Sequence, residues 1–107
     1  MELQYRIEEE SLFVPMPREV DHHAAKSISR EIDFLIDSWH VKRVVFDFEN
    51  TEFMDSSVIG VMIGRSRTME LYRGEVYAIH MCERAKRIFE KSALDRIVRT
   101  DYFEDGR

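Results

Sequence analysis

Apolar and polar residues at the start of the chain follow the pattern of a β-hairpin. The segment LQYRI (3–7) alternates apolar and polar residues, the acidic EEES (8–11) follows as a turn, and LFVPMP (12–17) is a second apolar segment. Pro15 and Pro17 lack backbone N–H donors, which suits an edge strand or a strand end. We therefore predict two short strands, the second of which ends at these prolines.

The next segment has the spacing of an amphipathic helix. Its apolar residues recur mostly every three or four positions with charged residues between them, and Asp21 precedes them as an N-cap. The apolar stripe consists of Ala24, Ala25, Ile28, Ile32, Leu35, Ile36 and Trp39. We predict a helix that begins after Asp21 and buries this stripe.

Strand-like and helix-like segments alternate in the rest of the chain. Strands are expected at 41–48, 75–81 and 96–103, and helices at 57 to about 71 and around Ala85, Ile88 and Phe89. This order predicts one α/β domain that spans residues 1–107, with a mixed β-sheet and helices packed mainly on one face. A length of 107 residues fits a single core.

Composition narrows the classes of function. The net charge is -5, from 16 basic and 21 acidic residues, so we expect no binding to nucleic acid. The single cysteine, Cys82, excludes an internal disulfide, and the N-terminus lacks the order of a signal peptide. No apolar run approaches the roughly 18 residues of a membrane span. We therefore expect a cytoplasmic protein without direct membrane insertion.

The junction FMDSSVIG (53–60) places a carboxylate and two hydroxyls between a strand and a helix. Asp55, Ser56 and Ser57 all suit helix starts, where each stabilises by about 1 kcal/mol, so a purely structural role fits them. The same turn would also expose a serine where a phosphate meets free N–H groups and the positive helix end. Phosphorylation would add about -1.5 to -2 charges beside Asp55 and repel a docked partner.

Two motifs carry a resemblance to a known family. FMDSSVIGVMIGR and EVDHHAA resemble the signatures of the anti-sigma factor antagonists of the STAS family, in register from about Leu12 to Arg99. The sporulation stage II AA type is the most similar. The resemblance implies a STAS-type domain in which Ser56 is the phosphorylated serine and Asp21 and Asp55 are its acidic neighbours.

The resemblance also implies a partner. This partner is an anti-sigma factor with serine kinase activity, which binds the unphosphorylated antagonist and releases its sigma factor. Phosphorylation of Ser56 ends that binding, and a serine phosphatase restores it. The expected contact surface consists of Asp21, His22, Asp55, Ser57 and Gly60. On this interpretation the protein is no enzyme and needs no cofactor.

The chain departs from the family pattern at three places. Val58 and Arg18 stand where the family often has glycine, so we expect the partner to meet bulkier side chains at both. The family usually adds a further helix at the C-terminus, for which TDYFEDGR (100–107) leaves little chain.

Three alternatives compete with this function. The chain could instead be the STAS subunit of a membrane transport complex. A hydrolytic site of Asp21, Asp55 and a serine would need His22 or His23 as general base, a role that the resemblance does not assign. Zinc binding by His22 and His23 is disfavoured, because adjacent helical residues point about 100° apart. We therefore expect no metal site.

Two glycines stand on the second predicted helix. Gly60 and Gly64 are four residues apart and form a bare stripe that admits another backbone. The stripe either packs against the domain itself or contacts a partner, and Gly60 belongs to the family motif.

Overall fold

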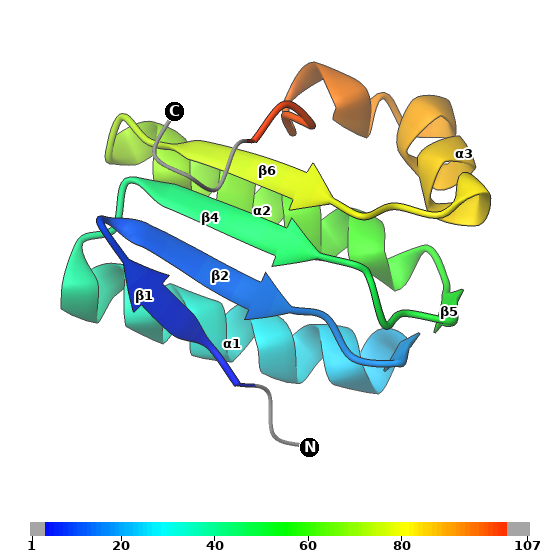
Figure 1. The fold of residues 1–107 in the computed structure, drawn as a ribbon, viewed down its shortest axis with the longest axis horizontal. Coiled ribbons are helices and arrows are strands. Elements are labelled where there is room, and N and C mark those ends of the chain that lie inside the picture. The colour runs from blue at the N-terminus through cyan, green and yellow to red at the C-terminus, as the bar shows by residue number, and fades with distance from the viewer. Residues whose placement is uncertain (1–3, 103–107) are drawn as a thin grey trace.

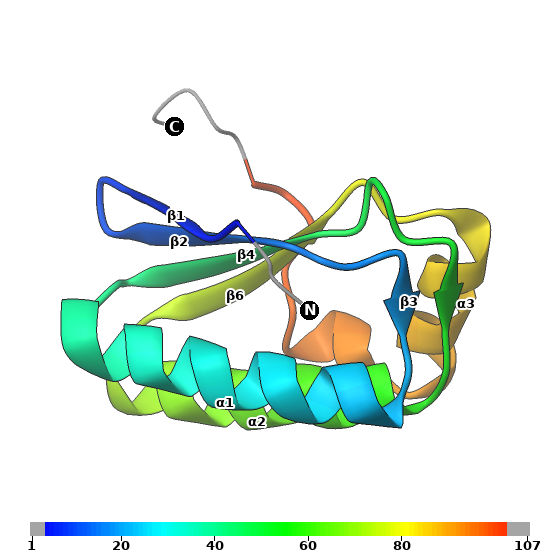
Figure 2. The ribbon, with the colours of Figure 1, turned by 90° about the horizontal axis from the view of Figure 1, so that it is seen from below.

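The computed structural model describes residues 4–102, which form a four-stranded sheet with two long helices against one face (Figures 1 and 2). The strand order is β1 (Arg6–Glu8), β2 (Ser11–Pro15), β4 (Arg43–Asp47) and β6 (Glu75–Ile79). The β1–β2 pair is antiparallel, whereas β2, β4 and β6 are parallel. The predicted α/β class, with a mixed sheet and helices mainly on one face, is confirmed.

The N-terminal hairpin has a two-residue turn. Glu9 and Glu10 both have positive φ angles, 47° and 70°, as the tight turns that suit a twisted hairpin require. The second strand ends at Pro15 and lies between β1 and β4, so this proline marks a strand end and not a sheet edge. The first strand begins at Arg6, and Leu3 lies outside the described residues.

The helices α1 (His22–Trp39) and α2 (Ser57–Leu71) connect the parallel strands and lie side by side beneath the sheet (Figure 2). Both were predicted with nearly these bounds. Trp39 is an error, since it is 62% exposed and not part of the buried stripe. The buried residues Ile28, Ile32 and Ile36 are each four positions apart. The next position in this series is His40, so Trp39 lies off the buried face.

Two strands of two residues each were not predicted. β3 (Glu19–Val20) precedes α1, β5 (Phe53–Met54) precedes α2, and the two pair in parallel as a separate small sheet. Figure 2 shows them side by side, away from the main sheet. They tie together the two loops from which the helices start.

The third predicted helix is confirmed as α3 (Glu83–Lys91), whose Phe89 meets Phe48 edge to face with ring centroids 6.1 Å apart. The predicted strand at 96–103 is wrong over residues 96–102, and Phe103 lies outside the described residues. Leu94–Arg96 forms a 3₁₀ turn, and Arg99 makes a single parallel bridge with Tyr77 of β6. The segment passes β6 and rises to the second face of the sheet instead of running along the strand (Figure 2).

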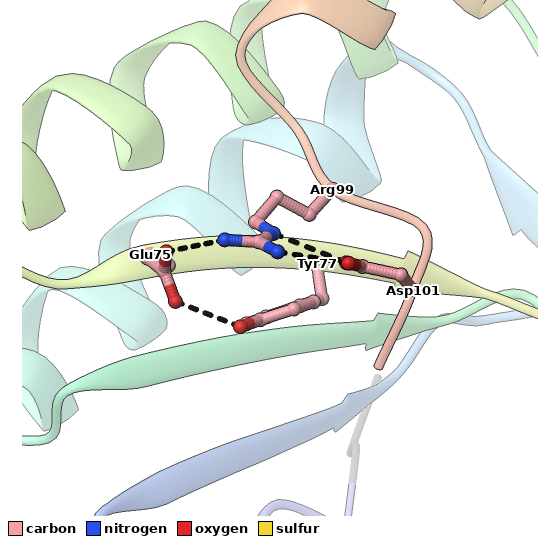
Figure 3. A network of polar contacts seen from close by, with 4 residues as sticks. All are labelled: Glu75, Tyr77, Arg99 and Asp101. Atoms are coloured by element: carbon pink, nitrogen blue, oxygen red, sulfur yellow. Dashed lines mark hydrogen bonds and ion pairs between the residues drawn. The ribbon is translucent and has the colours of Figure 1, made fainter. Parts of the chain in front are cut away.

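Four side chains hold this last segment against β6 (Figure 3). The guanidinium of Arg99 donates to Glu75 at 2.7 Å and to both carboxylate oxygens of Asp101 at 3.0 and 2.8 Å. The Tyr77 hydroxyl donates to Glu75 at 2.7 Å. The chain is thereby fixed where it leaves the helical layer.

The core has two parts, one on each face of the sheet. The larger part lies between the sheet and α1 and α2, with Leu12, Val44 and Phe46 fully buried. The smaller part, on the second face, groups Phe13, Val45 and Tyr77, with Tyr102 packed against them. Within residues 4–102, no helix combines the length and the apolar character that a bilayer crossing demands.

Candidate partner-binding site

The starts of α1 and α2 lie together because their preceding strands pair. Val20 of β3 stands opposite Met54 of β5, so the next residues, Asp21 and Asp55, are also neighbours. The Asp55 N–H donates to the Val20 carbonyl at 3.2 Å. Both helices therefore begin at the carboxyl ends of parallel strands, which is where sites in α/β folds usually form.

Asp21 and Asp55 both satisfy backbone donors at helix starts. The Asp21 carboxylate accepts a bond from the Ala24 N–H at 2.9 Å, which confirms it as the N-cap of α1. The Asp55 carboxylate accepts from the Ser57 N–H at 2.8 Å. That bond, the Ser57 hydroxyl and the nearby His22 keep the pKa of Asp55 below its usual value. Asp55 is therefore ionised near neutral pH.

Ser56 is left out of this capping. Its side chain is exposed and its backbone is already helical, with φ -65° and ψ -9°. Within the described residues its hydroxyl makes no capping hydrogen bond. The structural role that the sequence allowed for this serine is thus filled by Asp55, and the Ser56 hydroxyl stays accessible.

The backbone donors at the start of α2 are occupied. The N–H groups of Ser57, Val58 and Ile59 donate to the Asp55 carboxylate, the Asp55 carbonyl and the Ser56 carbonyl, at 2.8, 3.2 and 3.0 Å. The expectation that a phosphate on Ser56 would meet free N–H groups at these three positions is wrong. The positive end of the helix remains.

Four of the predicted site residues line one open groove between α1 and α2. This groove has a volume of about 570 Å³. Its polar and glycine lining consists of His22, Lys26 and Ser29 from α1, Ser57 and Gly60 from α2, and Ser56, the residue before α2. Asp21 instead lines an adjacent hollow with Arg18 and His23, and Asp55 flanks the groove at the start of α2.

Residues 2–105 match the sequence pattern of the STAS domain. The chain belongs to the STAS domain family. The family resemblance of the two motifs is thereby confirmed.

Proteins similar to this STAS domain include anti-sigma factor antagonists. It is 29% identical over 85 residues to an anti-sigma F factor antagonist from Lysinibacillus sphaericus, covering 79% of this chain and 73% of that protein. It superposes on the unphosphorylated anti-sigma factor antagonist SpoIIAA with a TM-score of 0.83 at 26% identity, covering 94% and 89% of the two chains. Phosphorylated SpoIIAA, a Bacillus cell fate determinant, gives 0.76 at 26%, covering 94% and 92%.

Lys26 and Ser29 of the STAS domain were missed by the sequence analysis. They follow His22 at four and seven residues along α1, and this helical spacing places all three on one face. That periodicity was a usable signal, because the sequence predicts a helix over this segment. What the sequence lacked was the pairing of β3 with β5, which turns this face toward Ser56.

The glycine stripe of the STAS domain faces open space. A Cβ atom added at Gly60 or Gly64 would meet no described atom within 4 Å other than its immediate surroundings on α2. The two glycines therefore do not serve to pack α2 closely against another described part of the domain. Gly60 lines the groove, whereas Gly64 stands one turn further along.

The two family departures differ in exposure. Val58 is fully buried, so the expectation that a partner meets its side chain is wrong. Val58 lies on the same buried face of α2 as Val61 and Met62. Arg18 is exposed and pairs with Glu52 at 2.9 Å, so its side chain is available at the surface beside Asp21.

One group of side chains in the described part of the chain is close enough to share a metal ion. Asp47, Glu49 and His80 bring one ligand atom each within 4.8 Å of one another. The Asp47 carboxylate already accepts the Glu49 N–H at 2.9 Å and lies 2.8 Å from the His80 ring nitrogen. These bonds account for the arrangement, which lies outside the groove.

Proposed function

We propose that this protein is a cytoplasmic anti-sigma factor antagonist that phosphorylation of Ser56 switches off. The observation that carries the proposal is the exposed Ser56 hydroxyl, which helix capping does not use and which lines the groove between α1 and α2. Relatives named as anti-sigma F factor antagonists, and SpoIIAA structures in two phosphorylation states, support it.

In the unphosphorylated state the domain binds an anti-sigma factor with serine kinase activity. The contact surface comprises the groove and its flanks, namely Asp21, His22, Asp55, Ser57 and Gly60. Binding displaces a sigma factor from that partner. By analogy with SpoIIAA, this is a sigma factor of the sporulation type. The domain acts as a binding module and leaves the chemistry to its partners.

The kinase step modifies Ser56 alone. The Ser56 Oγ forms a bond to the γ-phosphorus of ATP, the bond from that phosphorus to the β,γ-bridging oxygen breaks, and ADP leaves. The hydroxyl proton passes to a base of the kinase. A serine phosphatase later hydrolyses the ester, which returns the hydroxyl and releases inorganic phosphate.

The phosphate changes the affinity through charge and volume. It adds about -1.5 to -2 charges next to the ionised Asp55, at a surface shaped for a partner. A modification shifts binding only by the difference it makes between bound and unbound states. A loss of about 3 kcal/mol would weaken the complex more than a hundredfold.

A phosphorylation assay tests this function. The protein is incubated with ATP and the anti-sigma serine kinase from the same organism, and the modified residue is mapped by mass spectrometry. We expect phosphate on Ser56, none on Ser56→Ala, and normal modification of the control Ser38→Ala, an exposed serine of α1 outside the groove. Modification of Ser57, or equal incorporation into Ser56→Ala, contradicts the proposal, as does a lack of any modification.

A further inference from the structure

A phosphoryl group on Ser56 would sit at the groove between α1 and α2, so its local donors can be named. The backbone N–H groups of Ser57, Val58 and Ile59 are already hydrogen-bonded within the turn. Apart from the Ser56 N–H, the protein donors left for the phosphate oxygens at this place are side chains of the groove. Arginine, lysine and protonated histidine make the strongest such bonds to phosphate.

Two basic side chains face Ser56 across the groove. His22 and Lys26 are one helical turn apart on α1, and both line the groove together with Ser56. Both side chains are exposed and can adjust their rotamers. Within residues 4–102, Lys26 takes part in no ion pair or side-chain hydrogen bond, so its ammonium group can bind a new anion without breaking such a contact.

The other charged groups around the groove have partners or face elsewhere. Asp55 is held by the Ser57 N–H and is close enough to His22 for the histidine to lower its pKa. Asp21 caps α1 and lines the adjacent hollow. Further along α2, Arg65 pairs with Asp33 of α1 at 3.0 Å. Lys26 is therefore the cation best placed to answer a new negative charge on Ser56.

We propose that His22 and Lys26 bind the phosphoryl group of phosphorylated Ser56 within the groove. This inference rests on the proposed phosphorylation of Ser56 and adds how the modified state is held. The dianion is partly neutralised by Lys26, and by His22 when its ring is protonated, and the ester fills the groove between α1 and α2. Partner side chains that enter this groove in the unmodified state then lose both the space and the positive charge.

The test installs phosphoserine at position 56 directly, by genetic code expansion, so no kinase is needed. The second pKa of the phosphate, about 6 for an exposed phosphoserine, is read by a ³¹P NMR titration. A neighbouring cation favours the dianion and lowers this pKa, so Lys26→Gln should raise it by about 0.5 to 1 pH unit. Arg30→Gln is the matched control, since Arg30 is an exposed cation of α1 outside the groove.

Histidine resonances give a second, independent measurement. Without any change at Lys26, the pKa of His22 should be higher in the phosphoserine protein than in the unmodified protein, by about 1 pH unit. The His22 signal is assigned with His22→Asn. An unchanged His22 pKa, or equal phosphate pKa values in wild type, Lys26→Gln and Arg30→Gln, overturns the inference.

The two proposals fail separately. If the kinase assay shows no phosphate on Ser56, the proposed function falls, while the titrations of the installed phosphoserine still report on the groove. If the kinase modifies Ser56 and the titrations of the three proteins coincide, the switch stands and the phosphate is held by other means.

Discussion

Two roles at the start of α2, helix capping and the exposure of a hydroxyl, belong to different residues. Asp55 receives the Ser57 N–H and keeps a lowered pKa, so it supplies both the cap and a fixed negative charge. Ser56, one position on, is exposed, and within residues 4–102 its hydroxyl makes no capping hydrogen bond. The sequence alone does not tell which of the two residues caps the helix, because aspartate and serine are both common capping residues.

Gly60 offers a prediction at this scale, with Gly64 as its matched control. Neither glycine has a described atom within 4 Å of an added Cβ beyond its own part of α2, and both lie inside the helix. Gly60→Ala and Gly64→Ala should each stabilise the fold by about 0.5 to 1 kcal/mol, since alanine favours helix. The measurement is the free energy of unfolding in urea.

The two glycine variants should differ in their affinity for the partner. Gly60 lines the groove, so a methyl group there should weaken the complex with the anti-sigma kinase, whereas Gly64→Ala should bind as wild type. Isothermal titration calorimetry gives both affinities. Equal affinities for the two variants would mean that the groove is not part of the contact surface.

At the scale of elements, periodic segments were predictable and short ones were not. Helices α1 and α2 have long amphipathic or motif-defined segments, and their bounds were close to those observed. β3 and β5 hold two residues each, too few for any period to show, and they exist because the chain brings them side by side. The segment after Arg96 is apolar enough for a strand but leaves the plane of the sheet.

The β1–β2 turn stores backbone strain that substitution should relieve. Glu9 and Glu10 occupy the left-handed region, which costs a residue with a side chain about 1 to 2 kcal/mol. Asn-Gly suits such turns, so Glu9→Asn with Glu10→Gly should stabilise by about 1 kcal/mol and raise Tm by about 4 to 8 °C. Differential scanning calorimetry measures the change.

A charge control accompanies the turn variant. Glu9→Gln with Glu10→Gln removes the same two charges and keeps the left-handed strain, so its Tm should stay near that of wild type. An equal rise in both double variants would assign the gain to charge repulsion instead of backbone conformation.

The Arg99 network predicts how stability depends on pH. Hydrogen bonds from Tyr77 and from Arg99 lower the pKa of Glu75, and Arg99 lowers the pKa of Asp101. A lowered carboxyl pKa stabilises the fold above the unfolded value of about 4, and this stabilisation is lost as pH falls through the folded pKa. Arg99→Met should therefore reduce Tm at pH 7, and the difference should shrink toward pH 2.

The matched control for this series is Arg67→Met. Arg67 is an exposed arginine of α2 for which the described part of the structure shows no ion pair. Its substitution should leave Tm nearly constant relative to wild type at every pH. A difference for Arg99→Met that stays constant from pH 7 to pH 2 would show that the network does not act through ionised carboxylates.

For the whole molecule, topology explains where the site lies. Strands β2, β4 and β6 run in parallel, so the helices that follow β2 and β4 begin at the same end of the sheet. The β3–β5 pair then narrows the gap between these helix starts. The fold class and the position of the serine were predictable from pattern and resemblance, whereas the groove with Lys26 depends on contacts between distant segments.

Phosphate on Ser56 alone is expected to switch partner binding. The most direct measurement is the Kd of the anti-sigma kinase for the unmodified protein and for the protein carrying phosphoserine at position 56, with phosphoserine at the exposed position 38 of α1, outside the groove, as control. We predict a Kd more than a hundredfold higher for phosphoserine 56, with an unchanged circular dichroism spectrum. Equal Kd values for the unmodified and phosphoserine 56 proteins would contradict the account.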